Sequence, residues 1–238
     1  MRRERSFPPE RQPAAKPRRK ASPRPAEGAA QQAEGRAYFL ETHDVSRETL
    51  ARLDRYVALL TEWQRQINLV APATIGDVWS RHIADSLVLE RLLPPFQRCV
   101  DLGSGAGLPG LVVAAVRAEQ GGIVDLVESN AKKAAFLRAV QRGLGLAGTV
   151  HAARIGDCGA ALAAADLVTA RALAPLPELL AFVAPHIGTS ARCFFQKGRS
   201  HEQEINQAAA HWRFTMIKHE SNVENGSAIL EIGDIARR

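Results

Sequence analysis

The chain has 238 residues, of which 46% are apolar and 24% are charged, and its formal net charge is +6. No window approaches the ~18 continuous apolar residues of a membrane-spanning helix, so we expect no membrane partner. Three cysteines without a C-x-x-C pair argue against a disulfide framework or a cysteine-based zinc site. The length fits one large domain or a domain with an appendage, and the cysteine content fits a reducing cytoplasm.

The positive charge is confined to the beginning of the chain. Residues 1–36 contain ten Lys or Arg, four Glu and six prolines, whereas the remainder contains 21 basic and 21 acidic residues. Such a composition cannot bury enough apolar surface to offset its ordering entropy, so it predicts a disordered tail over residues 1–36. The tail could add sequence-independent affinity for RNA phosphates, or it could be dispensable.

Two amphipathic helices follow the tail. Apolar residues at steps of three and four predict a helix over residues 45–68, with Ser46 as its N-cap and Glu48 in its first turn. A second helix is predicted over residues 77–92, because Pro94 and the proline after it end the pattern. Residues 37–95 are therefore expected to form an N-terminal helical cap on a main domain over residues 96–238.

The stretch over residues 100–110 carries the strongest signal. Apolar residues run into Asp101, four glycines follow at close intervals, and a helix pattern begins after them. A strand, a glycine turn and a helix N-terminus together bring backbone N–H groups close to a ligand. The spelling G-x-G-x-x-G, with Glu128 about one βαβ unit later, would suit a dinucleotide. The spelling D-x-G-x-G-x-G from Asp101 instead resembles the first motif of S-adenosylmethionine-dependent methyltransferases.

Strand and helix patterns alternate after the glycine stretch. Strands are predicted at 123–127, 150–153, 166–170 and 191–195, and helices at 130–143, 176–184 and 202–211. Two last strands, 214–218 and 228–232, are joined through an Asn-Gly hairpin signal and should be antiparallel. The alternation predicts an α/β fold, a mostly parallel sheet with helices on both faces. The antiparallel end favours the methyltransferase version over the dinucleotide version.

In such a sheet, ligands bind outside the carboxyl ends of the strands. Glu128 ends the second strand, where it could accept from both ribose hydroxyls of an adenosine or could cap the helix beginning near Asn130. Asp157 could lie near the adenine or merely start a short helix. Arg171 follows the fourth strand and could hold a methionine carboxylate or a substrate phosphate bidentately, or form an internal salt bridge.

Several stretches match one known family in order and spacing. They are Asn68-Leu69-Val70, residues 81–87 (Arg-His-Ile-Ala-Asp-Ser-Leu), the glycine stretch with its Leu108-Pro109-Gly110, residues 128–137, Arg171-Ala172-Leu173-Ala174 and Lys197-Gly198. Together they resemble the ribosomal small-subunit methyltransferase G family, also called glucose-inhibited division protein B. The resemblance implies a Rossmann-like class I S-adenosylmethionine methyltransferase with a seven-stranded sheet. Its substrate would be ring nitrogen 7 of one guanosine in the decoding-region loop of 16S rRNA.

The resemblance also implies site residues. The cofactor-binding set is Asp101, Gly103, Gly105, Gly107, Leu108, Glu128, Ile155, Gly156 and Arg171. The RNA-binding set is Arg81, His82, Lys132, Lys133 and Lys197. His82 is more readily explained as a buried hydrogen-bonding residue with Asp85 as its partner. For the two adjacent lysines an ordinary solvated helix face is the alternative to RNA binding. The family commonly has Arg-x-Glu where this chain has Arg154-Ile155-Gly156-Asp157, which leaves the role of that glutamate to Asp157 or to no residue.

No catalytic dyad is expected, because nitrogen 7 of guanine carries a lone pair and no proton. Arg171 would only position the reactants. The expected partner is 16S rRNA in the small subunit or its assembly intermediates, and we expect a monomer although no pattern fixes the oligomeric state. Three alternatives remain. They are a methyltransferase acting on a small molecule or protein, a nicotinamide-dependent reductase, and an RNA-binding assembly factor without cofactor.

Overall fold

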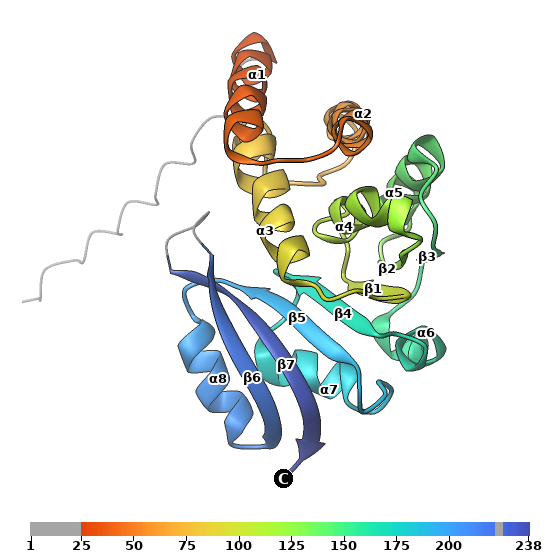
Figure 1. Ribbon diagram of the computed structural model, residues 1–238, viewed down its shortest axis with the longest axis vertical. Coiled ribbons are helices and arrows are strands. Elements are labelled where there is room, and N and C mark those ends of the chain that lie inside the picture. The colour runs from red at the N-terminus through yellow and green to blue at the C-terminus, as the bar shows by residue number, and fades with distance from the viewer. Residues whose placement is uncertain (1–24, 222–225) are drawn as a thin grey trace, which may run out of the picture.

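The computed structural model describes residues 25–221 and 226–238. Its strands are β1 (Arg98–Leu102), β2 (Ile123–Val127), β3 (Val150–His151), β4 (Leu167–Arg171), β5 (Arg192–Lys197), β6 (Trp212–Ser221) and β7 (Ser227–Arg237). They form one seven-stranded sheet in the order β3-β2-β1-β4-β5-β7-β6, and Figure 1 shows it crossing the molecule. The first five strands are parallel, and β7 is antiparallel to both β5 and β6. This architecture confirms the predicted parallel sheet with an antiparallel terminal pair.

Helices cover both faces of the sheet (Figure 1). They are α4 (Gly110–Arg117) and α5 (Ala131–Leu144) on one face, and α6 (Gly159–Ala163), α7 (Leu176–Val183) and α8 (His201–Ala209) on the other. A separate apolar cluster fills each interface. The central strands β1 and β2 are buried over almost their whole length, as strands covered on both faces must be.

The N-terminal helices extend the cluster on the α4 and α5 face. They are α1 (Pro25–Thr42), α2 (Arg47–Trp63), the 3₁₀ turn η1 (Pro72–Thr74), the π-helical turn η2 (Val78–Ile83) and α3 (Ala84–Leu92). As predicted, the side chain of Ser46 caps α2 by accepting from the backbone N–H of Thr49. The second predicted helix spans the expected residues but begins as a π-helical turn. None of the helices in the described ranges is long and apolar enough to cross a membrane.

The prediction of disorder over residues 1–36 is wrong for residues 25–36, which belong to α1. Tertiary contacts outweigh composition there. Two nitrogens of the Arg36 guanidinium, Nε and Nη2, donate to the two carboxylate oxygens of Asp54 over 2.6 and 2.7 Å, and Phe39 is fully buried against the Trp79 ring. Residues 1–24, which carry nine of the ten basic residues of the predicted tail, lie outside the described residues, as does Asn225 of the predicted Asn-Gly turn.

Candidate functional site

Two cavities open at the carboxyl ends of the parallel strands. The first, which we call the loop cavity, measures about 660 Å³ and is lined by the glycine loop (residues 103–109), the end of β2, residues 153–157 and α7. The second, the arginine cavity, measures about 530 Å³ and is lined by Arg81, Arg171 and the ends of β5, β6 and β7. Both cavities are lined by Ala172, Leu173 and Ala174. We call these three residues the partition.

The glycine loop adopts a backbone shape that other residues rarely reach. Gly103, Gly105 and Gly107 have φ angles of 62°, 55° and 91°. A Cβ at Gly103 would lie 2.5 Å from a methyl of Leu173, and one at Gly107 would collide with the side chain of Leu111. At Gly105 the nearest atom would be 3.6 Å away, so a side chain there would project into the loop cavity instead. The first two glycines therefore line the cavity, and Gly107 turns the chain beneath it.

Asp101 lies underneath the glycine loop. It is fully buried at the end of β1, where its register partner on β4 is Thr169, whose hydroxyl donates to Oδ1 over 2.7 Å. Its other oxygen faces the backbone of Gly110 at the start of α4. Burial raises the pKa of Asp101 to about 6. Asp101, Gly107 and Leu108 thus shape the loop but do not line the loop cavity, and a direct cofactor contact for them stays a prediction.

Glu128 connects the end of β2 to the glycine loop. Its Oε2 accepts from the Gly105 N–H over 2.9 Å, and its Oε1 accepts from the Asn130 N–H over 2.7 Å. The N-cap of α5 is Asn130, whose side chain accepts from the N–H groups of Lys132 and Lys133. Glu128 lines the loop cavity, and a carboxylate with two acceptor positions filled has about two left.

The far wall of the loop cavity is a single 3₁₀ turn, η4 (Ile155–Asp157). A Cβ at Gly156 would have no atom within 4 Å, so this residue faces open space. Asp157 is the last residue of this turn and lines the cavity, and its placement near an adenine stays a prediction. Phe182 of α7 also lines this cavity, with 36% of its surface exposed. The sequence offered no signal for Phe182, because α7 is almost entirely apolar.

Arg171 lines the arginine cavity and not the loop cavity. One of its nitrogens lies 3.3 Å from the Asp85 carboxylate, and another lies 3.3 Å from Nδ1 of His82. Asp85 also accepts from the Ser221 hydroxyl at 3.2 Å, and its backbone carbonyl accepts from the side-chain amide of Gln196 at 3.1 Å. The internal salt bridge is therefore the one of its predicted alternatives that the structure shows.

His82 is buried and neutral. Its Nε2 lies 3.1 Å from the Thr74 hydroxyl, and burial, followed by the nearby charges of Arg171 and Arg81, lowers its pKa to about 3. This agrees with the expectation of a buried hydrogen-bonding histidine, with contacts to Thr74 and Arg171. A neutral ring can contact RNA only as a hydrogen-bonding group and not as a cation; His82 lines the arginine cavity, and its RNA-binding role stays a prediction.

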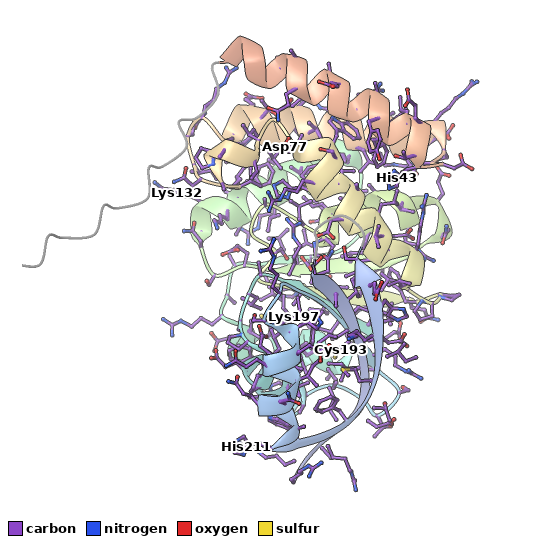
Figure 2. The ribbon with its side chains drawn as sticks, turned by 90° about the vertical axis from the view of Figure 1, so that its left-hand side faces the viewer. His43, Asp77, Lys132, Cys193, Lys197 and His211 are labelled. Carbon is purple, nitrogen blue, oxygen red and sulfur yellow. The ribbon has the colours of Figure 1, made fainter. Side chains whose placement is uncertain are left out.

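Lys197 is also buried but lines the arginine cavity, and its RNA-binding role stays a prediction. Its Nζ donates to the Ala174 carbonyl over 2.7 Å and lies 2.6 Å from Glu204. Glu204 in turn accepts from the Leu176 N–H over 2.9 Å. Lys197 therefore braces the partition at the wall of the arginine cavity, and Figure 2 shows it well apart from Lys132.

The other predicted RNA-binding residues do not share one rim. Arg81 is exposed at the arginine cavity, Lys133 is half-buried at the loop cavity, and Lys132 is exposed on α5 and lines neither. The sequence reasoning missed Tyr56, which is fully buried on α2 and donates its hydroxyl hydrogen to the Ala106 carbonyl of the glycine loop over 2.7 Å. Its place on the apolar stripe of α2 was the available signal.

The fold and the loop cavity together define a class of protein, the Rossmann-like class I S-adenosylmethionine-dependent methyltransferases. A solved Corynebacterium glutamicum protein has a similar fold, with a TM-score of 0.53 and 14% identity over 84% of this chain and 95% of that one. A mutant of MtNAS, solved in complex with S-adenosylmethionine, gives a TM-score of 0.50 and 15% identity over 78% of this chain and 76% of that one. At these identities the likeness shows the fold alone.

Sequence comparison identifies the family. The model of the family described as rRNA small subunit methyltransferase G matches residues 49–231. The ribosomal RNA small subunit methyltransferase G of Rhizobium meliloti (strain 1021) is 48% identical over 198 residues, 82% of this chain and 93% of that protein. The Rhodopseudomonas palustris (strain BisB18) protein of the same name is 46% identical over 220 residues, 92% of each chain. The chain belongs to the rRNA small subunit methyltransferase G family, which confirms the resemblance seen in its motifs.

Proposed function

We propose that this chain transfers a methyl group from S-adenosylmethionine to nitrogen 7 of one guanosine in the decoding-region loop of 16S rRNA. The substrate would be the small ribosomal subunit or one of its assembly intermediates in the cytoplasm. One observation carries the proposal beyond family membership: the loop cavity and the arginine cavity meet at the partition. This arrangement suits a cofactor in one cavity and a nucleotide of the substrate in the other.

The residues of the loop cavity fit S-adenosylmethionine. Its volume lies within the range of about 300–1,000 Å³ typical of small-molecule sites. Glu128 supplies carboxylate acceptors suited to ribose hydroxyls, and the η4 backbone with Ile155 and Gly156 supplies a wall suited to adenine. At Gly105 and Gly156 the missing Cβ atoms leave room that a larger residue would fill. Asp101, Gly107 and Leu108 support the cofactor through the shape of the loop.

The chemistry asks for alignment and not for a general base. When bound, S-adenosylmethionine supplies an electrophilic methyl group, and nitrogen 7 of guanine has a free lone pair and no proton to lose. The contribution of the protein is then to hold the two reactants in line, and approximation of this kind supplies roughly 7–11 kcal/mol. The partition is suited to fix the separation of the two reactants, since Lys197 and Glu204 brace it.

Arg171 is the proposed positioning cation. It lies in the arginine cavity, which favours a substrate phosphate over the methionine carboxylate as its ligand. Because a guanidinium has five N–H donors, it can bind a phosphate while one edge stays on Asp85. Arg81 at the same cavity, with Lys132 and Lys133 on α5, would add phosphate contacts over a larger footprint. The basic residues at 1–24 would likewise add affinity for RNA phosphates. We propose that the chain acts as a monomer.

The test is transfer of tritiated methyl from S-adenosylmethionine to small subunits that lack this methyl group, with the modified nucleotide mapped. Label on one guanine at nitrogen 7 is expected. Arg171→Ala should lower kcat/KM for subunits about 100-fold while changing the cofactor Kd less than threefold, and Arg171→Lys should fall between. Cofactor binding without labelled RNA would refute the substrate, and absence of cofactor binding would refute the enzyme.

A further inference from the structure

A single hydroxyl joins the N-terminal helices to the glycine loop. Tyr56 of α2 is fully buried, and its hydroxyl donates to the backbone carbonyl of Ala106 over 2.7 Å. Ala106 lies between Gly105, which lines the loop cavity, and Gly107, which turns the chain toward α4. The middle of the loop is therefore tied to a helix fifty residues earlier in the chain.

The loop is held from the opposite side as well. The Gly105 N–H donates to Glu128 over 2.9 Å, and the Ser104 N–H donates to the Val127 carbonyl over 3.0 Å, both at the end of β2. Glycine has little intrinsic preference between positive and negative φ, so external contacts must select the positive φ of Gly105. Contacts with β2 on one side and with Tyr56 on the other supply that selection.

The hydroxyl is a permanent donor. Burial raises the pKa of Tyr56, the neighbouring charge of Arg171 opposes this and that of Asp101 adds to it, and the net direction is upward. The side chain therefore stays neutral and protonated throughout the working pH range. A backbone carbonyl in this buried place would otherwise lack a partner, which is costly.

We propose that Tyr56 is a positioning residue for cofactor binding, which holds the Ala106 carbonyl and so keeps the glycine loop in the shape that S-adenosylmethionine requires. The inference rests on the proposed function, because that function defines the ligand of the loop cavity. Without the hydroxyl, the loop would sample other conformations, and binding would have to order it. Tyr56 touches neither reactant and acts only through the loop.

Tyr56→Phe removes the hydroxyl and keeps the ring. Loss of about one net hydrogen bond predicts that the Kd for S-adenosylmethionine rises about tenfold, measured by calorimetric titration of the full chain. In methyl transfer to small subunits, the KM for S-adenosylmethionine should rise by a similar factor. The kcat at saturating S-adenosylmethionine should stay within about twofold, since the reacting atoms are untouched.

Two matched variants separate positioning from general loosening. Tyr38→Phe removes the hydroxyl of a tyrosine that is 58% exposed, and Leu60→Val trims a fully buried residue of the same helix that has no hydroxyl. Both should leave the Kd unchanged at a temperature where all variants are folded. Replacing Tyr56 by 4-aminophenylalanine restores an N–H donor and should return the Kd to within about threefold of the native value.

The outcomes distinguish this inference from the proposed function. If the native chain does not bind S-adenosylmethionine, the proposed function itself fails. If the native chain binds and Tyr56→Phe binds equally well, or Leu60→Val gives the same weakening, only the role of Tyr56 is refuted. If Tyr56→Phe does not fold, the 4-aminophenylalanine chain decides. Native-like binding supports the role, and failure to fold refutes it, because the hydroxyl would then serve folding itself.

Discussion

The loop cavity and the arginine cavity lie next to each other at one edge of the sheet but are built differently. The loop cavity depends on backbone shape, with two left-handed glycines and a 3₁₀ turn in its lining, and it has Glu128 as its main anchor. The arginine cavity is formed by charged side chains that are already paired, Arg171 with Asp85 and Lys197 with Glu204. A backbone cradle holds one ligand shape, whereas paired side chains can exchange partners when a substrate arrives.

Removing the anchor of the loop cavity should have the largest effect. Glu128→Ala deletes the acceptors for the Gly105 and Asn130 N–H groups as well as those proposed for ribose. Hydrogen bonds to a charged group are worth about 1.5–3 kcal/mol each, so the Kd for S-adenosylmethionine should rise at least about 100-fold. Calorimetric titration measures this, with the half-exposed, ion-paired Glu119→Ala as control. A change below tenfold would show that backbone alone holds the cofactor.

Breaking a buried pair of the arginine cavity should act first on stability. Lys197→Met leaves Glu204 without its cation beside the partition, and loss of one partner of a buried pair costs about 3–5 kcal/mol in the free energy of unfolding. Urea unfolding should show this loss, whereas Lys132→Met, at an exposed site, should stay within about 0.5 kcal/mol. A loss below 1 kcal/mol for Lys197→Met would mean that the pair does not brace the partition.

Asp101, the buried acid beneath the glycine loop, should make the stability of the fold decrease as the pH rises. The folded pKa of Asp101 is raised from 3.8 to about 6, so the folded state binds the proton more tightly. Its contribution to stability is complete below about pH 4 and is lost as the pH rises through 6, on the order of 3 kcal/mol. Relative to the native chain, Asp101→Asn should therefore gain stability from pH 4 to 6.5 in urea unfolding. A constant difference across this range would contradict the assignment.

His82, at the arginine cavity, should make the stability of the fold decrease as the pH falls. The folded pKa of His82 is lowered from 6.5 to about 3, so the unfolded state binds the proton more tightly. Its contribution to stability is present above pH 6.5 and is lost as the pH falls, on the order of 2 kcal/mol by pH 5. Relative to the native chain, His82→Gln should gain stability as the pH falls over this range. If the stabilities of Asp101→Asn and His82→Gln, each relative to the native chain, change in the same direction with pH, the two residues do not have opposite effects on pH dependence.

The smallest effect is expected on the outer surface, away from both cavities. Lys132→Ala removes one exposed charge, so the KM for small subunits should rise about two- to threefold with an unchanged Kd for S-adenosylmethionine. The effect should shrink in higher salt. Arg213→Ala, on the exposed edge strand β6, is the matched control. Equal effects of the two variants would show that α5 does not face the RNA.

The two regions also differ in how far the sequence predicted them. The glycine spacing, Glu128 and the η4 residues follow local patterns, because each depends on a turn or a strand end. The partners of Lys197 and Arg171 could not be foreseen, since Arg171 meets Asp85 across 86 positions of the chain. Composition averaged over residues 1–36 concealed the start of α1, a helix that contacts the rest of the molecule through residues such as Arg36, which pairs with Asp54. The bounds of the short helix α6 could not be foreseen, since five residues with one large apolar side chain, Leu162, have no period to detect.

The position of β7 has a consequence for biosynthesis. β7 is the last of the described strands to leave the ribosome, yet it lies between β5 and β6, and Ala228 and Ile229 line the arginine cavity. Until β7 arrives, β5 and β6 cannot form their pairings with it, whereas the strands around the glycine loop have already been synthesised. A nascent chain can therefore complete its loop cavity before its arginine cavity. A chain interrupted before residue 227 would keep the first cavity and lack the second.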